Sequence, residues 1–152
     1  MIKEATIEHV LARLESAATD YESAIHDFAE RQPELMDYLT NEDVEAFTEP
    51  ERELLLFAAL VIYRCIDDER AGVREVTGEQ IANAEERNYE RLTQIKAPTF
   101  RDRLTPFFEE SEEEELLAFV EDLTLADGED EISSEAREPF FVTLKTVIDT
   151  LA

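Results

Sequence analysis

The sequence predicts an all-α protein, and three observations lead to that fold class. Apolar residues recur at spacings of three and four along most of the chain, which is the period of an amphipathic helix. No segment alternates between apolar and polar residues over several positions, and β-branched residues do not gather into strand-like runs. The 152 residues have the length of one domain, so we expect a single-domain helical bundle of about five main helices plus short helical segments.

The first predicted helix is long and covers residues 3–31. Its apolar residues follow one another at alternating spacings of four and three through about eight turns. This stripe consists of Ile7, Leu11, Leu14, Ala18, Tyr21, Ile25 and Phe28. Three apolar positions per heptad favour a helix that lies on a globular body, and the stripe also leaves a homodimer seam open.

Two short helical segments are predicted next. Residues 33–39 form one of them, because Pro33 suits the first position of a helix, where its missing N–H is not needed. Residues 42–47 form the other, because the side chain of Asn41 can accept a hydrogen bond from a free N–H of the first turn.

The most apolar helix of the chain is predicted at residues 50–67. It is hydrophobic on nearly all sides, which is typical of a helix at the centre of a bundle. Its longest apolar run, 54–63, has ten residues, about half of what a bilayer span requires. We therefore predict a buried helix and no association with a membrane.

The next main helix is predicted from Thr77 to Ile95. Thr77 and Gln80 have the spacing of a capping box, in which each side chain accepts from the backbone N–H of the other residue. The inner side of this helix is predicted to carry Ile81, Ala84, Tyr89, Leu92 and Ile95. The following stretch, 96–107, contains two prolines and is predicted to be a connection.

Two amphipathic helices complete the predicted bundle. Ser111 and Glu114 have the spacing of a second capping box, which begins a helix that extends to about Ala126. The final helix runs to about Leu151, and Pro139 marks its first turn or a break just inside it.

An internal duplication is possible, with units at 50–95 and 112–151. Each unit consists of an apolar helix, an acidic loop, a Ser or Thr cap and a second helix. The matching segments are "ELLLF" (53–57) with "ELLAF" (115–119), and "EVTGE" (75–79) with "EISSE" (131–135). Because these matches use the abundant residues Glu and Leu, chance similarity is the alternative.

The charge of the chain argues against several classes of partner. Asp and Glu number 39 against 14 Lys and Arg, which gives a net charge of −25. The two halves of the chain contain 19 and 20 of these acidic residues, so the charge belongs to the whole surface. Since the sequence contains no basic cluster, we predict no direct nucleic-acid binding and no binding to an anionic membrane.

The acidity itself has two further explanations. The chain has three Lys and eleven Arg against 39 acidic residues, which resembles proteins of a high-salt cytoplasm, where ions screen the mutual repulsion of carboxylates. Alternatively, the protein is an acidic mimic of nucleic acid. Such mimicry needs a row of carboxylates at phosphate-like spacing, and evenly spread charge has the wrong distribution for it.

The residues that usually carry metal or nucleophilic chemistry are few. Cys65 is the one cysteine, so no internal disulfide forms and a reducing, cytoplasmic location is expected. Because Cys65 lies in the most apolar helix, we predict a buried thiol of low reactivity. His9 and His26 fall outside the apolar stripe of their helix and are predicted to lie on the surface. These residues do not have the arrangement of a zinc or di-iron site.

An acidic loop supplies the candidate metal ligands, Asp127, Glu129 and Glu131. Closely spaced carboxylates suit hard cations, so a Ca²⁺ or Mg²⁺ site is possible, and a solvated turn is the preferred alternative. A calcium EF-hand is excluded, because a loop starting at Asp127 has Ile132 at its sixth position, where the EF-hand requires Gly.

The same loop resembles part of the tellurite-resistance TerB-like family, which consists of small all-helical bacterial domains. In that family an Ala-Asp-Gly-Glu loop precedes an aliphatic residue, a Ser or Thr, and a helix start that bears Glu. The matching residues here are Ala126, Asp127, Gly128, Glu129, Ile132, Ser133 and Glu135. Asp130 and Glu131 interrupt the pattern, and Glu135 comes one place early. The resemblance covers about 35 residues and implies a stress-linked or metal-associated role.

Taken together, these features predict a non-enzymatic acidic helical domain of the cytoplasm that binds a protein partner or itself. No cofactor is expected. A TerB-like domain with a cation-binding loop and an acidic nucleic-acid mimic are the alternatives.

Overall fold

The computed structural model of the chain describes residues 1–16, 18–41, 47–70, 72–126 and 132–152. Within these residues it contains eight α-helices and no strand, so the prediction of an all-α fold is confirmed. The helices are α1 (Glu4–Ser16), α2 (Ala18–Arg31), α3 (Pro33–Leu39), α4 (Glu49–Arg70), α5 (Gly78–Gln94), α6 (Phe100–Glu110), α7 (Glu114–Thr124) and α8 (Arg137–Leu151).

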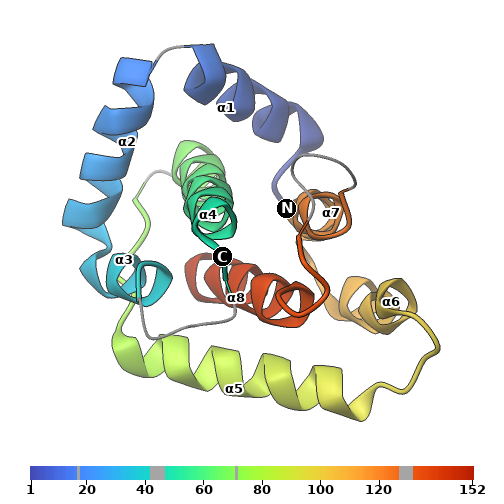
Figure 1. Cartoon of the computed structure of the whole chain (residues 1–152). Helices are drawn as coiled ribbons and strands as arrows, with labels where there is room; N and C mark the ends of the chain where they lie inside the picture. The colour runs from blue at the N-terminus through green and yellow to red at the C-terminus, as the bar shows by residue number, and fades with distance from the viewer. Residues whose placement is uncertain (17, 42–46, 71, 127–131) are drawn as a thin grey trace.

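Two helices, α4 and α8, lie at the centre of the molecule and the others surround them (Figure 1). α8 packs against α4, α5 and α7, while α1, α2 and α3 also contact α4. α5 runs along one side of the molecule, and α6 follows it at the edge that also carries α7 (Figure 1). The helix predicted at 50–67 is therefore central, as its apolar character on all sides indicated.

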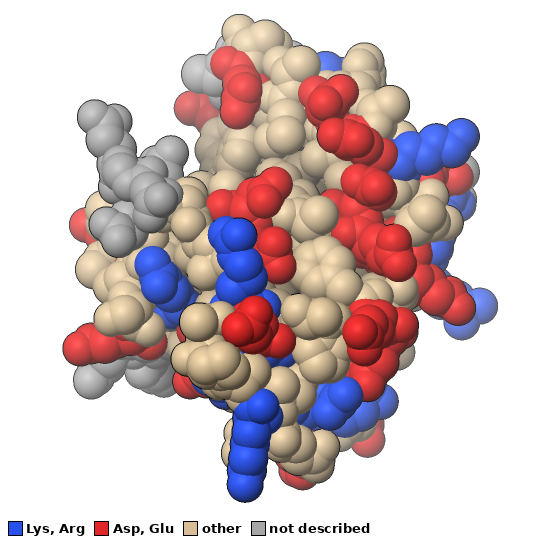
Figure 2. Space-filling view, turned by 90° about the vertical axis from the view of Figure 1, so that its right-hand side faces the viewer, with Lys and Arg blue, Asp and Glu red and all other residues tan. Residues whose placement is uncertain are grey.

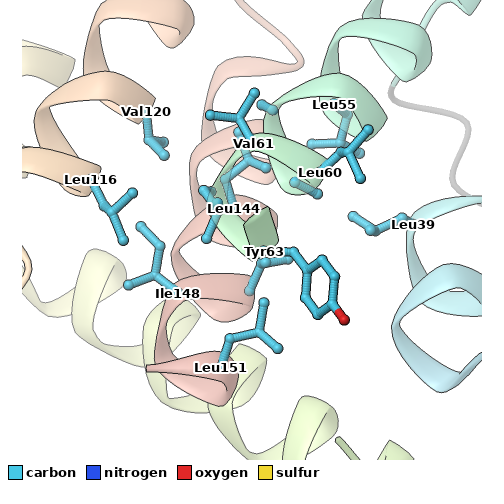
Figure 3. Close-up of a cluster of buried hydrophobic side chains, with 14 of the residues drawn as sticks. Leu39, Leu55, Leu60, Val61, Tyr63, Leu116, Val120, Leu144, Ile148 and Leu151 are labelled. Atoms are coloured by element: carbon cyan, nitrogen blue, oxygen red, sulfur yellow. The ribbon is translucent and has the colours of Figure 1, made fainter. Parts of the chain in front are cut away.

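The described hydrophobic core is one continuous cluster that draws residues from Ile2 to Leu151. Figure 3 shows side chains of α3, α4, α7 and α8 that point toward one another in this cluster. The labelled side chains are Leu39, Leu55, Leu60, Val61, Tyr63, Leu116, Val120, Leu144, Ile148 and Leu151. Each of them is buried, and full burial of one aliphatic side chain stabilises the fold by roughly 1.5–3 kcal/mol.

The single long helix predicted at residues 3–31 is wrong, because the structure has two helices there. α1 and α2 run in different directions (Figure 1). α1 packs on α4 and α7, whereas α2 packs on α3 and α4, and a straight helix of about 42 Å would not follow that curved surface. The apolar spacing continues from one helix into the next, so periodicity alone does not reveal the change of direction.

The short helix predicted at 33–39 is confirmed as α3, with Pro33 at its first position. The segment predicted at 42–47 lies mostly outside the described residues. No helix among the described residues has both the length and the apolar character that crossing a membrane requires.

The capping box predicted at the start of α5 is confirmed. The Thr77 hydroxyl accepts from the Gln80 backbone N–H at 3.2 Å, and the Gln80 side chain accepts from the Thr77 N–H at 3.0 Å. The loop before it is held by Gln32, a fully buried residue between α2 and α3. The Gln32 side chain donates to the Arg74 carbonyl and accepts from the Val76 N–H, each at 2.8 Å.

The connection predicted at residues 96–107 is wrong, because α6 occupies most of it. Thr99 caps this helix by accepting from the Asp102 N–H at 3.1 Å. Pro106 lies inside the helix, where proline costs about 3 kcal/mol. The burial of Leu104 and Phe107 offsets this cost, and the Phe107 ring also packs edge-on against a core phenylalanine of α8 at 5.2 Å between ring centres.

The capping box predicted for Ser111 and Glu114 is also wrong. α7 begins at Glu114, and the cap position is held by Glu113, whose own N–H donates to the Ser111 hydroxyl at 3.0 Å. The buried Glu113 carboxylate instead accepts from the Ile2 N–H at 2.9 Å and from Arg70 at 3.2 Å. A long-range contact with the first residues of the chain therefore decides how this helix begins.

The last helix begins at Arg137, which confirms Pro139 as part of its first turn. In the proposed duplication, Val76 of the first unit aligns with Ile132 of the second, and both side chains are buried. The helices that the alignment pairs differ in length, since α4 has 22 residues and α7 has 11. The duplication stays a prediction.

Candidate functional site

The candidate site is the outer face of α5, which carries an exposed tyrosine among carboxylates. Of the large hydrophobic side chains that the structure describes, two are exposed, Met1 and Tyr89. Tyr89 lines a shallow hollow of about 730 Å³. The described residues of this hollow, which we call the α5 outer face, are Ala82, Glu85, Glu86, Tyr89, Glu90, Thr93 and Gln94.

The exposure of Tyr89 corrects the prediction that placed it on the inner side of its helix. Asn88 takes the inner position instead and is only 6% exposed, whereas Tyr89 is 39% exposed. The Asn88 side-chain amide donates to Thr146 at 3.2 Å and to Asp149 at 3.1 Å, both on α8. These bonds satisfy the buried amide, so a polar residue can occupy a core position that the apolar pattern assigned to its neighbour.

The electrostatics of the α5 outer face are set by three glutamates. The Tyr38 hydroxyl of α3 donates a hydrogen bond to Glu85, which fixes the position of that half-buried carboxylate. Glu86 and Glu90 are exposed, and within the described part of the chain neither has a hydrogen-bond or ion-pair partner. The face therefore presents unneutralised negative charge beside an aromatic ring.

The two tyrosines near Glu85 stay protonated at neutral pH. Burial raises the pKa of Tyr38 above its usual range, and its hydrogen bond to the Glu85 carboxylate raises it further. Burial also raises the pKa of Tyr89, with smaller contributions from the negative charges of Glu85 and Glu138. The Tyr89 ring therefore keeps its neutral hydroxyl and its electron-rich face, which attracts cations.

The neighbouring edge of the molecule, where α6 and α7 lie, has a mixed charge pattern. Figure 2 shows acidic side chains over much of this face, with basic side chains among them. Two of the underlying contacts are ion pairs that connect α6 to its neighbours, Arg91 with Glu110 at 2.6 Å and Arg103 with Glu138 at 2.7 Å.

The other residues that the sequence singled out are the candidate metal ligands, Cys65 and the two histidines. The candidate metal ligands Asp127, Glu129 and Glu131 lie outside the described residues. Within the residues that are described, no group of three His, Cys, Asp or Glu side chains could hold a metal ion. Cys65 is fully buried, and burial raises the pKa of its thiol to about 12. His9 and His26 are exposed, as predicted.

Sequence reasoning missed the α5 outer face because it assigned Tyr89 to the core. A signal for the correct placement was present in the residues around it. The spacing of Ile81, Ala84, Asn88 and Leu92 is helical, and it leaves Tyr89 beside the outward-facing Glu86 and Glu90.

Comparison with known proteins gives no relative. No protein-family model matches the chain, and no curated protein or solved structure matches it either. The resemblance of residues 126–135 to the TerB-like family therefore stays a prediction.

Proposed function

We propose that this chain is a non-enzymatic interaction domain that binds a basic segment of a protein partner through the α5 outer face. The observation that carries the proposal is the exposed Tyr89 ring, which lies among the carboxylates of Glu85, Glu86 and Glu90. An arginine side chain can stack its planar cation on such a ring and bond a carboxylate at the same time.

The geometry of α5 supports a partner in an extended or helical conformation. Residues on the outer face recur at spacings of three and four, so they form a stripe that runs along the helix axis. The opposite face of α5 packs on α8, which holds the stripe rigid. A rigid surface loses little side-chain and backbone freedom on binding, which favours affinity.

The net charge favours a different protein over a second copy of this chain. Two copies of charge −25 repel each other at low ionic strength, whereas a basic segment is attracted. The described surface also exposes few large hydrophobic side chains, and obligate homodimers bury such side chains at their interfaces.

The mixed charge on the α6 and α7 edge gives less support to nucleic-acid mimicry. Basic side chains lie among the acidic ones on that face (Figure 2). A mimic would present carboxylates in the uninterrupted rows that phosphates form along a nucleic-acid strand.

Fluorescence anisotropy with a labelled peptide of alternating arginine and glycine tests the proposal. We expect saturable binding at 0.15 M KCl. Tyr89→Ala should weaken the affinity by about twofold to thirtyfold, because an exposed cation–π contact contributes about 0.5–1 kcal/mol and a partly desolvated one about 2 kcal/mol. Tyr89→Phe keeps the ring and should keep the affinity. The double variant Glu86→Gln with Glu90→Gln should weaken binding by a similar factor.

A matched control separates this site from general attraction between opposite charges. The double variant Glu109→Gln with Glu112→Gln removes the same charge from exposed residues of the α6 and α7 edge. It should change the affinity less than the α5 variant does. Equal weakening by the two double variants, or a dimer in light scattering that Tyr89→Ala dissociates, would contradict the proposal.

A further inference from the structure

A second hollow lies between α5, α6 and α8, and its lining is basic in a strongly acidic protein. It has a volume of about 230 Å³. We call it the basic hollow, and its lining residues are Arg87, Asn88, Arg91, Phe107, Glu110, Ser111 and Lys145. Three of the 14 basic residues of the chain therefore meet here against one carboxylate among the described lining residues, because Arg87 and Arg91 lie one turn apart on α5 and α8 brings Lys145 beside them.

The cations of the basic hollow hold more hydrogen-bond donors than their protein partners use. Arg91 donates from Nε and Nη2 to Glu110, at 3.2 and 2.6 Å, and a guanidinium has five N–H groups. Lys145 donates to Asp149 at 2.5 Å, and an ammonium has three N–H groups. Arg87 has no hydrogen-bond or ion-pair partner within the described part of the chain. The remaining donors of these three residues are free to bond an anion.

The ion pairs that are present leave the basic hollow with a net positive charge. The carboxylates of Glu110 and Asp149 balance Arg91 and Lys145, so the Arg87 charge is left over. The Ser111 hydroxyl accepts from the Glu113 N–H at 3.0 Å, and its own hydrogen is free to donate. Positive charges and hydrogen-bond donors from α5, α8 and the end of α6 thus face the basic hollow.

The walls of the basic hollow are fixed by the core. Asn88 and Phe107 are 6% and 3% exposed, and Asn88 bonds both Thr146 and Asp149 on α8. The Lys145 side chain is 12% exposed because its stem packs on these walls, while its ammonium group forms a solvent-exposed ion pair with Asp149. The walls therefore hold this cation beside the basic hollow.

We propose that the basic hollow binds one phosphate group, free or carried by a small molecule. Phosphate offers several oxygens to the donors of Arg87, Arg91 and Lys145, and arginine bonds phosphate in a bidentate manner. The proposal is independent of the α5 outer face. The charge of −25 does not prevent binding, because at 0.15 M salt charges more than about 8 Å away are largely screened. A nucleic acid would place further phosphates over the acidic surface and would be repelled.

Titration of ¹⁵N-labelled protein with inorganic phosphate, followed by NMR at pH 7.5 and constant ionic strength, tests the assignment. We expect saturable shifts of the Asn88 side-chain amide and the Ser111 backbone amide, with a dissociation constant of about 1 mM or lower. Arg87→Gln should weaken binding by about tenfold or more, because it removes a positive charge and charge-assisted hydrogen bonds to the phosphate. Arg87 is exposed, so the variant should fold, and its thermal melt verifies this.

Two controls make the result decisive. Arg13→Gln removes one exposed positive charge from α1 on the other side of the molecule and should leave phosphate binding unchanged (Figure 1). Acetate, a carboxylate with one charge, should bind at least several times more weakly than phosphate. Shifts that never saturate, an unchanged affinity in Arg87→Gln, an equal loss in Arg13→Gln, or equally tight acetate binding would each overturn the proposal.

Discussion

Glu51 shows how one buried carboxylate joins two distant parts of the chain. Its Oε1 accepts from the Thr48 N–H at 2.8 Å, which closes a capping box at the start of α4 together with the bond from the Glu51 N–H to the Thr48 hydroxyl. Its Oε2 accepts from the Ser133 N–H at 2.8 Å, just before α8. Both oxygens of this residue, which is 5% exposed, therefore satisfy backbone donors.

We predict that Glu51→Gln destabilises the protein by about 1–3 kcal/mol in urea or thermal unfolding, because an amide offers one acceptor oxygen where two donors require one each. Glu53→Gln is the matched control, since it removes the same charge from an exposed residue of the same helix. A Glu51→Gln protein that is as stable as the Glu53→Gln protein would refute the role assigned to this carboxylate.

The Glu51 contribution should also depend on pH. Burial alone would raise the pKa of Glu51, but the hydrogen bonds from Thr48 and Ser133 outweigh burial and hold the pKa below its ordinary value. A carboxyl with a depressed pKa stabilises the fold fully above the pKa of the unfolded chain, about 4.3, and loses this contribution as the pH falls through the lower folded value. The stability difference between native protein and Glu51→Gln should shrink in that acidic range.

At the scale of elements, Gln32 connects the α2–α3 junction to the loop between α4 and α5. Its side-chain amide donates to the Arg74 carbonyl and accepts from the Val76 N–H, so it bonds the loop as a neighbouring backbone segment would. The loop contains Gly72 at φ +108°, a conformation that residues other than glycine rarely adopt. The side chain and the glycine together set where α5 begins.

We predict that Gln32→Glu costs about 2–3 kcal/mol of stability at pH 7, because the new carboxylate turns an oxygen toward the Arg74 carbonyl in a fully buried site. Thermal melts will measure the effect. Gln94→Glu adds the same charge at an exposed residue of α5 and should change the stability by less than about 0.5 kcal/mol. Equal effects would mean that net charge, and not the Gln32 contact, determines the loss.

The helices also show which of their starts can be predicted from sequence patterns. The starts of α3 and α5 followed from local signals, because a proline or a capping box acts within one turn of the helix. α6 also has a local cap, the Thr99 hydroxyl that accepts from the Asp102 N–H, but the two prolines of this stretch led to the prediction of a connection. The start of α7 did not follow from a local signal. α6 tolerates Pro106 because distant aromatic residues pack on it, and α7 begins where Glu113 binds Ile2 and Arg70.

At the scale of the whole molecule, the net charge of −25 opposes the compact state through self-repulsion. The core contributes enough apolar burial to hold the chain together, but like charges on the surface remain close to one another. Salt reduces this repulsion, because the screening length falls to about 3 Å at 1 M. A high-salt cytoplasm would supply this screening.

We therefore predict that the melting temperature rises by about 5 °C or more between dilute buffer and 1 M KCl, which corresponds to roughly 1–2 kcal/mol for a chain of this length. A variant that replaces Glu109, Glu112 and Glu114 with Gln carries less charge and should show a smaller rise. A melting temperature that does not change with salt would show that the acidity does not limit stability, and would contradict the high-salt explanation.

The candidate sites depend on tertiary structure to different degrees. The carboxylates of the α5 outer face are visible in the sequence, but the exposure of Tyr89 depends on the buried bonds of its neighbour Asn88 to α8. The basic hollow has no sequence signal, because Arg87 and Arg91 meet Lys145 only when α5 packs against α8. No window of the chain contains that cluster.

The sequence by itself determined the helical fold class, the central position of α4, the surface position of both histidines and the buried state of Cys65. These properties follow from local spacing and from the transfer of apolar side chains out of water, which act on each segment separately. Tertiary structure decided that residues 3–31 form two helices, that 100–110 form α6, and which side chains face a common hollow. These outcomes depend on contacts between residues far apart in the chain, which local patterns do not encode.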